Sequence, residues 1–164
     1  MHNSNFIEIQ QFRQGWLLAL ILVPCISALI YIGFKIFRNW PMSGTNMLIF
    51  GAIALALVLV PVFMLLIKMV TEVKNDAIHI RFFPLKREVI PFSEIAKCDA
   101  RQYSPIKEYG GWGIRYGTKG MAYNVSGDRG VQLELNNGKR LLIGSQRSEE
   151  LAKTIKTFTK EEEG

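Results

Sequence analysis

The sequence predicts a membrane-embedded α-helical hairpin followed by an α+β, mainly β, domain that ends in a helix. Two long uncharged stretches and a charged, alternating C-terminal part predict this division. No charged residue lies between positions 14 and 34 or between 39 and 67. Residues 68–164 carry 17 basic and 13 acidic side chains, a net charge of +4. An apolar N-terminal part joined to a charged C-terminal part is typical of an integral membrane protein.

The two expected membrane spans cover about residues 16–36 and 46–67. Their uncharged cores would form helices of roughly 28 and 31 Å, close to the ~30 Å hydrocarbon core of a bilayer. Neither core has the polar stripe that a helix of a soluble protein carries. A secretory signal peptide is the main alternative for the first span. Its apolar run is longer than the roughly 7–15 residues of an h-region, and no A-x-A-like cleavage site follows it.

Basic residues near the span ends predict the orientation of the hairpin, because two spans leave both chain ends on one side. The loop of residues 35–46 carries two basic residues, whereas the other side carries six close to the span ends. By the positive-inside rule we expect a cytoplasmic N-terminal segment (residues 1–15) and a cytoplasmic C-terminal domain. The expected location is the cell inner (plasma) membrane.

The chemistry available inside the spans is sparse. Apart from the Cys25 thiol and the Tyr31 phenol, the uncharged cores of the spans contain no ionisable side chain, which argues against a transporter or pump built from this chain alone. Ala52 and Ala56 form a small-xxx-small pair that could allow close helix packing, within the hairpin or between copies. The chain has two Cys and two His without metal-ligand spacing, so we expect no disulfide framework, no metal site and no cofactor.

After residue 68 the apolar residues alternate with polar ones, which predicts short strands. The expected strands lie near residues 78–82, 87–92, 95–103, 112–116, 131–135 and 141–143. Asn137-Gly138 between two alternating runs is a strong hairpin signal, because both central residues of a type I′ turn need positive φ. Leu151, Ile155 and Phe158 then recur at helical spacing behind two glutamates, which predicts a helix over residues 148–160.

Two segments resemble a known fold family. Residues 130–155, GVQLELNNGKRLLIGSQRSEELAKTI, resemble the end of bacterial pleckstrin-homology-like (PH-like) domains: a strand, an Asn-Gly hairpin, a strand ending in I-G-S and a capping helix. Residues 89–100, VIPFSEIAKCDA, resemble the "P-x-x-E-I" step of those domains. The resemblance covers residues 70–160. It implies a curved antiparallel sheet or barrel of six or seven strands closed by one C-terminal helix.

The same resemblance says little about activity. Small bacterial membrane proteins with two spans followed by such a domain share this arrangement, and most have no assigned activity. The matching motifs are structural rather than catalytic. Cys98 and His79 are the only Cys and His of residues 68–164, and both lie in alternating strand patterns, where a small core residue is the simpler explanation for Cys98.

A glycine-rich stretch, EYGGWGIRYGTKG (residues 108–120), has five glycines in 13 residues. It matches neither G-x-G-x-x-G nor G-x-x-x-x-G-K-[ST], and no helix is expected after it to bind a phosphate. Glycine-rich turns around a short strand are therefore the plain interpretation. Because exposed Trp and Tyr often anchor interfaces, the stretch is also our candidate surface for a partner protein. Its candidate residues are Tyr109, Trp112, Arg115 and Tyr116.

Basic residues form the second candidate surface, for anionic lipid headgroups. The candidates are Arg81, Lys86, Arg87, Lys97 and Arg101. Each could contribute ~1 kcal/mol if it lies within a Debye length of the membrane surface. The alternative is a solvated charged face that only follows the positive-inside bias.

Together these patterns predict a non-enzymatic, membrane-anchored PH-like module that binds a partner protein or the inner membrane surface. Confining a domain to the membrane plane raises its effective concentration towards membrane neighbours. The alternative is an accessory subunit of a larger membrane complex, for transport or secretion, that packs through its hairpin. A homo-oligomer is a further possible assembly, and no nucleic-acid partner is expected.

Overall fold

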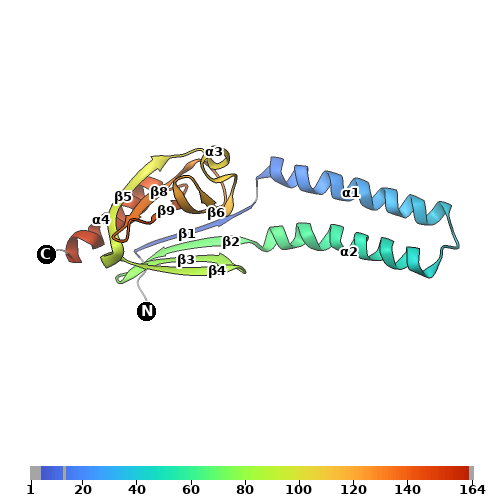
Figure 1. The fold of residues 1–164 in the computed structure, drawn as a ribbon, viewed down its shortest axis with the longest axis horizontal. Coiled ribbons are helices and arrows are strands. Elements are labelled where there is room, and N and C mark those ends of the chain that lie inside the picture. The colour runs from blue at the N-terminus through green and yellow to red at the C-terminus, as the bar shows by residue number, and fades with distance from the viewer. Residues whose placement is uncertain (1–4, 13, 163–164) are drawn as a thin grey trace. The chain divides into compact units, whose positions relative to one another are not determined.

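The computed structural model describes residues 5–12 and 14–162, which form two units (Figure 1). Residues 12–66 form a helical unit. The β unit combines the residues up to Gln11 with those from Ile67 onward. The chain therefore leaves the β unit once, forms the helical unit, and returns.

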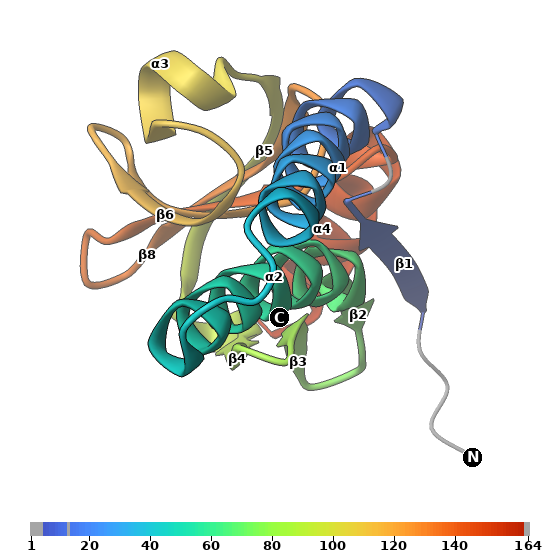
Figure 2. The same ribbon diagram turned by 90° about the vertical axis from the view of Figure 1, so that its right-hand side faces the viewer.

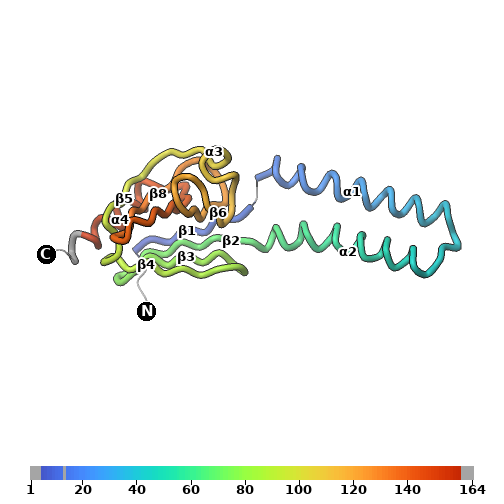
Figure 3. The backbone as a smooth tube through the Cα atoms, viewed as in Figure 1, coloured from blue at the N-terminus to red at the C-terminus, as the bar shows by residue number. Residues whose placement is uncertain are grey.

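The helical unit consists of α1 (Gly15–Arg38) and α2 (Gly44–Leu66), two antiparallel neighbours (Figure 3). Their bounds lie within two residues of the expected spans. Both helices are long and apolar enough to cross a membrane. A less exposed stripe on each helix follows helical spacing and marks the side that faces its partner. On α2 this stripe consists of Phe50, Ala54, Leu57, Pro61 and Met64.

The β unit contains two sheets, which Figure 2 shows as separate groups of strands. The first is antiparallel, in the order β1 (Phe6–Gln11), β2 (Lys68–Val73), β3 (Ala77–Phe83), β4 (Lys86–Pro91). The second has the order β5 (Ile95–Gln102), β8 (Arg129–Leu135), β9 (Arg140–Gly144), β7 (Gly120–Asn124), β6 (Gly113–Gly117). A 3₁₀ helix, η1 (Phe92–Glu94), carries the chain from the first sheet to the second. Two helices complete the unit, α3 (Pro105–Tyr109) and α4 (Ser148–Glu162).

The N-terminal segment is part of the β unit. β1 precedes α1 and β2 follows α2, yet the two strands pair antiparallel, from Phe6 opposite Val73 to Gln11 opposite Lys68. Residues 1–15 were expected to lie outside the domain, but six of them form its first edge strand. Both ends of the helical hairpin thus enter one sheet. A signal peptide that ended with α1 would remove β1 with it.

The expected barrel of six or seven strands is not what forms. The described residues contain nine strands in two sheets, and no closed barrel is present among them. The strands that were not expected are β1, β2 and β7, whereas β6 corresponds to the strand expected at residues 112–116. β7 pairs parallel with β9, so the second sheet is mixed rather than antiparallel. The insertion of α3, β6 and β7 between β5 and β8 therefore widens the second sheet instead of closing it.

The C-terminal part of the β unit follows the sequence pattern closely. β8 and β9 form the predicted hairpin, but its turn is not the expected type I′ turn. Gly138 has φ of 77°, whereas no residue other than glycine has positive φ in the described part of the chain, so Asn137 does not have it. The helix α4 places Leu151 and Ile155 in the core against β5 and β8. Phe158 stacks on Phe92 of η1, with ring centroids 5.3 Å apart. A single apolar stripe on α4 thereby covers one side of the second sheet.

Candidate functional site

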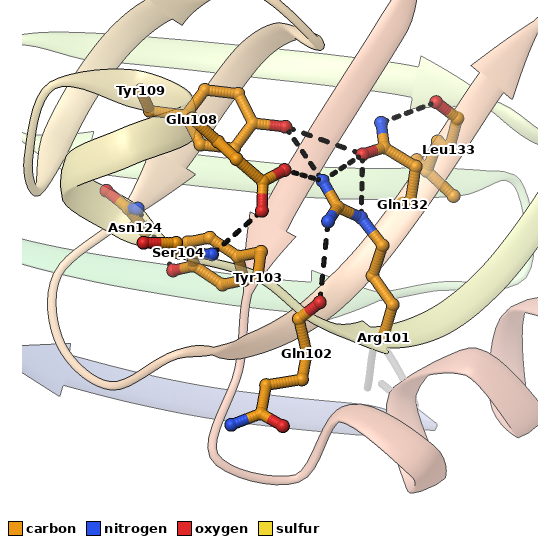
Figure 4. A network of polar contacts seen from close by, with 9 residues as sticks. All are labelled: Arg101, Gln102, Tyr103, Ser104, Glu108, Tyr109, Asn124, Gln132 and Leu133. Carbon is orange, nitrogen blue, oxygen red and sulfur yellow. Dashed lines mark hydrogen bonds and ion pairs between the residues drawn. The ribbon is translucent and has the colours of Figure 1, made fainter.

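The best-connected polar cluster of the β unit surrounds Arg101 on β5 (Figure 4). Its Nη2 donates to Glu108 Oε2 at 2.8 Å, to Gln132 Oε1 at 3.0 Å and to the Tyr109 hydroxyl at 3.2 Å. Its Nη1 donates to the carbonyl of Gln102 at 3.4 Å. The Arg101 side chain is only 25% exposed. Its donors are already engaged, so Arg101 anchors α3 to the sheet and is not available to a lipid headgroup.

Electrostatics keep the Arg101–Glu108 pair ionised. The hydrogen bond from Arg101 lowers the pKa of Glu108, burial opposes this, and the backbone N–H of Ser104, 2.8 Å from Oε1, lowers it further. Burial tends to lower the pKa of Arg101, but the bond to Glu108 outweighs it and raises that pKa. Burial also raises the pKa of Tyr109, which stays a neutral donor. The cluster is a closed structural network at neutral pH.

Replacing Glu108 with glutamine should lower the free energy of unfolding at pH 7 by about 2 kcal/mol, the usual worth of a charge-assisted hydrogen bond. Because the pKa of Glu108 is lowered on folding from 4.5, its contribution is complete above pH 4.5 and is lost as the pH falls through the folded value. The difference in the free energy of unfolding between the wild type and E108Q should therefore become smaller in acid. Denaturant unfolding of the full chain in detergent at several pH values measures this. E94Q removes an exposed carboxylate that forms no ion pair with any described residue, so its free energy of unfolding should match that of the wild type. A constant difference between E108Q and the wild type down to pH 3 would contradict the assignment.

The four residues expected to bind a partner protein do not form one surface. Tyr109 is 3% exposed and packs in a core cluster with Tyr103, so it cannot contact a partner. Trp112 is half-buried, and its Nε1 donates to the carbonyl of Gly127 at 3.0 Å. Arg115 is exposed, with Nε bound to the carbonyl of Trp112, and Tyr116 is 79% exposed. The positive φ of Gly110 ends α3 and turns the chain, which separates Tyr109 from the residues that follow.

A larger exposed surface lies on the first sheet, on the side away from the core. We call it the outer face, and its members point outward from all four strands. They are Ile7, Ile9, Lys68, Val70, Glu72, His79, Arg81, Phe83, Arg87 and Val89. The apolar members are unusually open to solvent: Ile9 is 63% exposed and Phe83 51%. The inner side of the same sheet holds fully buried Met69 and Ile80.

The kinds of side chain on the outer face change along the strands. Strand register places Lys68 opposite Phe83 at the end of the sheet where β2 begins. Two residues further along, Ile9, Val70, Arg81 and Arg87 lie side by side across the sheet. The acid of this face, Glu72, comes after those and pairs with Arg81 at 3.4 Å. Basic and apolar side chains therefore gather towards the β2 start.

The β3–β4 turn extends this surface. Its Phe83–Pro84 peptide is cis, and the Leu85 N–H donates to the Phe82 carbonyl at 2.7 Å, which closes a tight turn. Leu85 at the tip is 56% exposed. A groove of about 510 Å³ runs between this turn and the outer face, lined by four basic side chains and one acid, a local charge of +3. The charged lining residues are Lys68, Glu72, Arg81, Lys86 and Arg87.

The structure divides the residues expected to contact lipid. Arg81 and Arg87 lie on the outer face, and Lys86 lines its groove while it pairs with Glu88 at 2.8 Å. Lys97 lies on β5 of the other sheet and pairs with Glu134. Sequence reasoning missed Lys68, Phe83, Leu85 and Ile9. The available signal for Phe83 and Leu85 was the proline between them with Lys86 and Arg87 directly after, typical of an exposed turn. Ile9 and Lys68 join this surface only through strand pairing and had no local signal.

No catalytic or metal-binding arrangement is visible in the described part of the chain. Cys98 and His79 lie in different sheets. Burial raises the pKa of the Cys98 thiol to about 12, so it stays protonated and unreactive. Among the residues that the structure describes, no group of three or more His, Cys, Asp or Glu could hold a metal ion.

Comparison with known proteins gives a family but no activity. None of the curated proteins compared with the chain matches it. A family model described as "Family of unknown function (DUF6141)" matches residues 3–160, nearly the whole chain. The match includes β1, both long helices and the β unit up to α4. The chain therefore belongs to this family of unknown function, DUF6141.

Proposed function

We propose that the chain is a non-enzymatic, membrane-anchored module whose PH-like β unit binds the anionic surface of the inner membrane through its outer face. One observation carries this proposal: exposed Phe83 and Leu85 at a turn, with Lys68, Arg81 and Arg87 close to them. Apolar tips flanked by cations suit the boundary between acyl chains and negatively charged headgroups. Lys68 Nζ already lies 5.6 Å from the centre of the Phe83 ring.

Chain connectivity supports contact with the same membrane that α2 would cross. Lys68 follows Leu66, the last residue of α2, by two positions, so at most about 7 Å separates their Cα atoms. Register brings Phe83 to Lys68, and at ~3.3 Å per residue Arg81 lies about 7 Å further along the sheet. Arg81 can thus lie up to about 14 Å from the end of α2, and a charge acts over about one Debye length, ~8 Å, so the proposal requires the outer face to incline towards the membrane.

The expected free energy of binding to the membrane surface is small but sufficient to orient the β unit. Each cation near an anionic surface contributes ~1 kcal/mol, so Lys68, Arg81 and Arg87 together supply about 3 kcal/mol. That would hold a free domain on a membrane only weakly. A domain tethered by two spans meets the surface at high effective concentration, so a weak surface contact is enough to fix its orientation.

The proposal also includes the membrane topology, with the β unit in the cytoplasm, and a PH-like fold for that unit. Both ends of the hairpin lead into the first sheet, which supports two spans with both flanks on one side. The excess of basic residues on that side favours the cytoplasm. The Asn-Gly hairpin of β8 and β9 followed by α4 supports the PH-like assignment. The parallel β7–β9 pair is a departure from that pattern.

A fluorescent label on the β3–β4 turn tests the proposal. The chain, with Cys25 and Cys98 replaced by Ser and Ala, receives Leu85→Cys and an environment-sensitive nitrobenzoxadiazole dye. In nanodiscs with about 30% phosphatidylglycerol, emission should shift to the blue and be quenched by spin-labelled lipid. It should do neither in pure phosphatidylcholine. R81E with R87E should lower the equilibrium constant for the surface-bound state by about 30-fold, the equivalent of ~2 kcal/mol.

The matched control is K153E, which reverses an exposed charge on α4, and it should leave the emission unchanged. Raising the salt concentration should weaken the signal in the anionic discs. Equal emission in both lipids, or full retention of the shift in the double variant, would refute the surface role.

A subunit role in a larger membrane complex is the second candidate, and one observation favours it. Ala52 and Ala56 are exposed and lie outside the stripe through which α2 faces α1. A small-residue face that the hairpin does not use is open to another span. Under that role, A52L with A56L would dissociate a complex isolated from membranes while the label on the turn responds to lipid as before.

A further inference from the structure

A second groove runs along the free edge of β4. β4 is the last strand of the first sheet and pairs only with β3. The groove has a volume of about 620 Å³, and one wall includes the consecutive residues Glu88, Val89 and Ile90. Successive side chains of a strand point to opposite faces, so a cavity lined by three in a row must follow the edge of the strand rather than one face. Half of the backbone groups along that edge have no partner strand.

The opposite wall comes from the tips of two hairpins of the second sheet. The β6–β7 tip contributes residues 116–121, and the β8–β9 turn contributes residues 138–141. Three basic residues project from this wall, Lys119, Lys139 and Arg140. None of the three forms an ion pair with any described residue, unlike most other basic residues around the β unit.

The charges on the β4 side are already balanced. Glu88 accepts from Lys86 Nζ at 2.8 Å and from the Tyr123 hydroxyl at 2.9 Å. Burial alone would raise the pKa of Glu88, but these two hydrogen bonds lower it, so the carboxylate stays ionised and engaged. With Lys86 and Glu88 cancelling, Lys119, Lys139 and Arg140 face only Glu94 among the charged residues that line the groove, a net charge of +2. Its unsatisfied charge is positive.

We propose that this groove binds an extended, acidic segment of a partner protein, which adds to β4 as a fifth strand of the first sheet. Backbone groups of the edge would supply affinity, and the cations would select acidic side chains on the added strand. The free edge from Lys86 to Ile90 accommodates about five residues, or ~17 Å. Exposed Tyr116 at the groove offers an aromatic contact for the same segment.

Another copy of the same edge fits less well than an acidic strand. A second copy of β4 carries Lys86, Arg87 and Glu88, a net charge of +1, so its addition would place a basic strand against the cations of the groove. Pro91 at the end of β4 lacks a backbone N–H and limits how far any added strand can extend. Lys86 and Val89 contribute to both sites, but the cations that carry this proposal, Lys119, Lys139 and Arg140, lie outside the outer face, so its failure or success leaves the lipid proposal untouched.

Selection from a random peptide display library tests the groove without a known partner. The target is the full chain in nanodiscs of neutral phosphatidylcholine. The selected peptides should be enriched in Asp and Glu alternating with β-branched residues. A fluorescein-labelled representative should lose about tenfold in affinity with K139E plus R140E, the equivalent of 1.4 kcal/mol. The matched control, R129E plus K153E, reverses two exposed charges elsewhere and should leave the affinity unchanged.

Hydrogen exchange supplies the readout for strand addition. Bound peptide should slow amide exchange in residues 87–90 more than in β1, the other edge strand. Neutral or basic selected peptides, no enrichment at all, or affinity that survives K139E plus R140E would overturn the proposal. Competition by phosphatidylglycerol vesicles or by a second copy of the chain would assign the groove to lipid or to self-association instead, and would equally overturn it.

Discussion

Replacing Glu8 with alanine should lower the free energy of unfolding of the β unit by about 3–5 kcal/mol. The carboxyl group of Glu8, on β1, is buried between the two sheets and accepts three hydrogen bonds. Its donors are Ser145 Oγ at 2.5 Å, the Gln146 backbone N–H at 2.8 Å and Gln10 Nε2 at 3.0 Å. Glu8 is 8% exposed and Ser145 is fully buried. Alanine would leave buried donors without an acceptor, at roughly 1–3 kcal/mol each, with partial relaxation for Gln10.

Thermal unfolding of the full chain in detergent, combined with hydrogen exchange, measures this loss. Exchange should rise first in β1 and at the start of α4, because Glu8 joins these two segments. Ile7→Ala is the matched control: its side chain is on the same strand, faces outward and is 46% exposed, so the loss should stay below about 1 kcal/mol. Equal losses for the two variants would show that the Glu8 cluster does not hold β1.

The Glu8 cluster matters because β1 leads directly into α1. Gln10 Nε2 also donates to the Gly144 carbonyl at 2.8 Å, and Arg147 Nη1 donates to the carbonyl of Ile7 at 3.3 Å. The guanidinium of Arg147 lies 4.8 Å from the Phe6 ring centre. These contacts join the N-terminal strand to the end of β9 and the start of α4. The N-terminal approach to the hairpin is therefore held by the last elements of the chain as well as by β2.

The sequence pattern could not reveal β1, because its polarity is inverted. A half-buried strand normally turns its apolar residues inward. In β1, Glu8 and Gln10 face inward with Phe6, while Ile7 and Ile9 face outward. The inward polar groups are tolerated only because β9 and α4 supply their hydrogen-bond partners from more than 130 residues away. Local alternation cannot contain that information.

Elements that depend on local patterns were predictable. Uncharged length alone gives α1 and α2, Asn-Gly gives the β8–β9 turn, and one apolar stripe gives α4. The strand β7 and the five-residue α3 lack such patterns, and the parallel pairing of β7 with β9 joins segments about 20 residues apart. The candidate surfaces depend on that pairing and on strand order. Ile9, Lys68 and Phe83 come together only because β1, β2 and β3 are neighbours.

A second large effect is expected at Gly120, the first residue of β7. Its φ is +102°, a conformation that side-chain-bearing residues rarely adopt. A Cβ there would also lie well within 3.0 Å of the backbone carbonyl of Arg140, which real Cβ atoms essentially never show. Backbone strain of about 1–3 kcal/mol and a clash with rigid backbone add together, so Gly120→Ala should cost about 3–4 kcal/mol.

Gly138→Ala is the control that separates the cost of backbone conformation from the cost of crowding at the Cβ position. Gly138 also has positive φ, +77°, but a Cβ there would meet nothing within 4 Å. Its loss should be about 1 kcal/mol, measured by the same thermal unfolding in detergent. Similar losses at the two glycines would mean that the β6–β7 tip moves away from β9 at little cost. Gly120 and Arg140 both line the groove beside β4. Similar losses would therefore also mean that this wall of the groove moves when a ligand binds. A large Gly120 effect indicates instead that the groove has a fixed width before any strand is added.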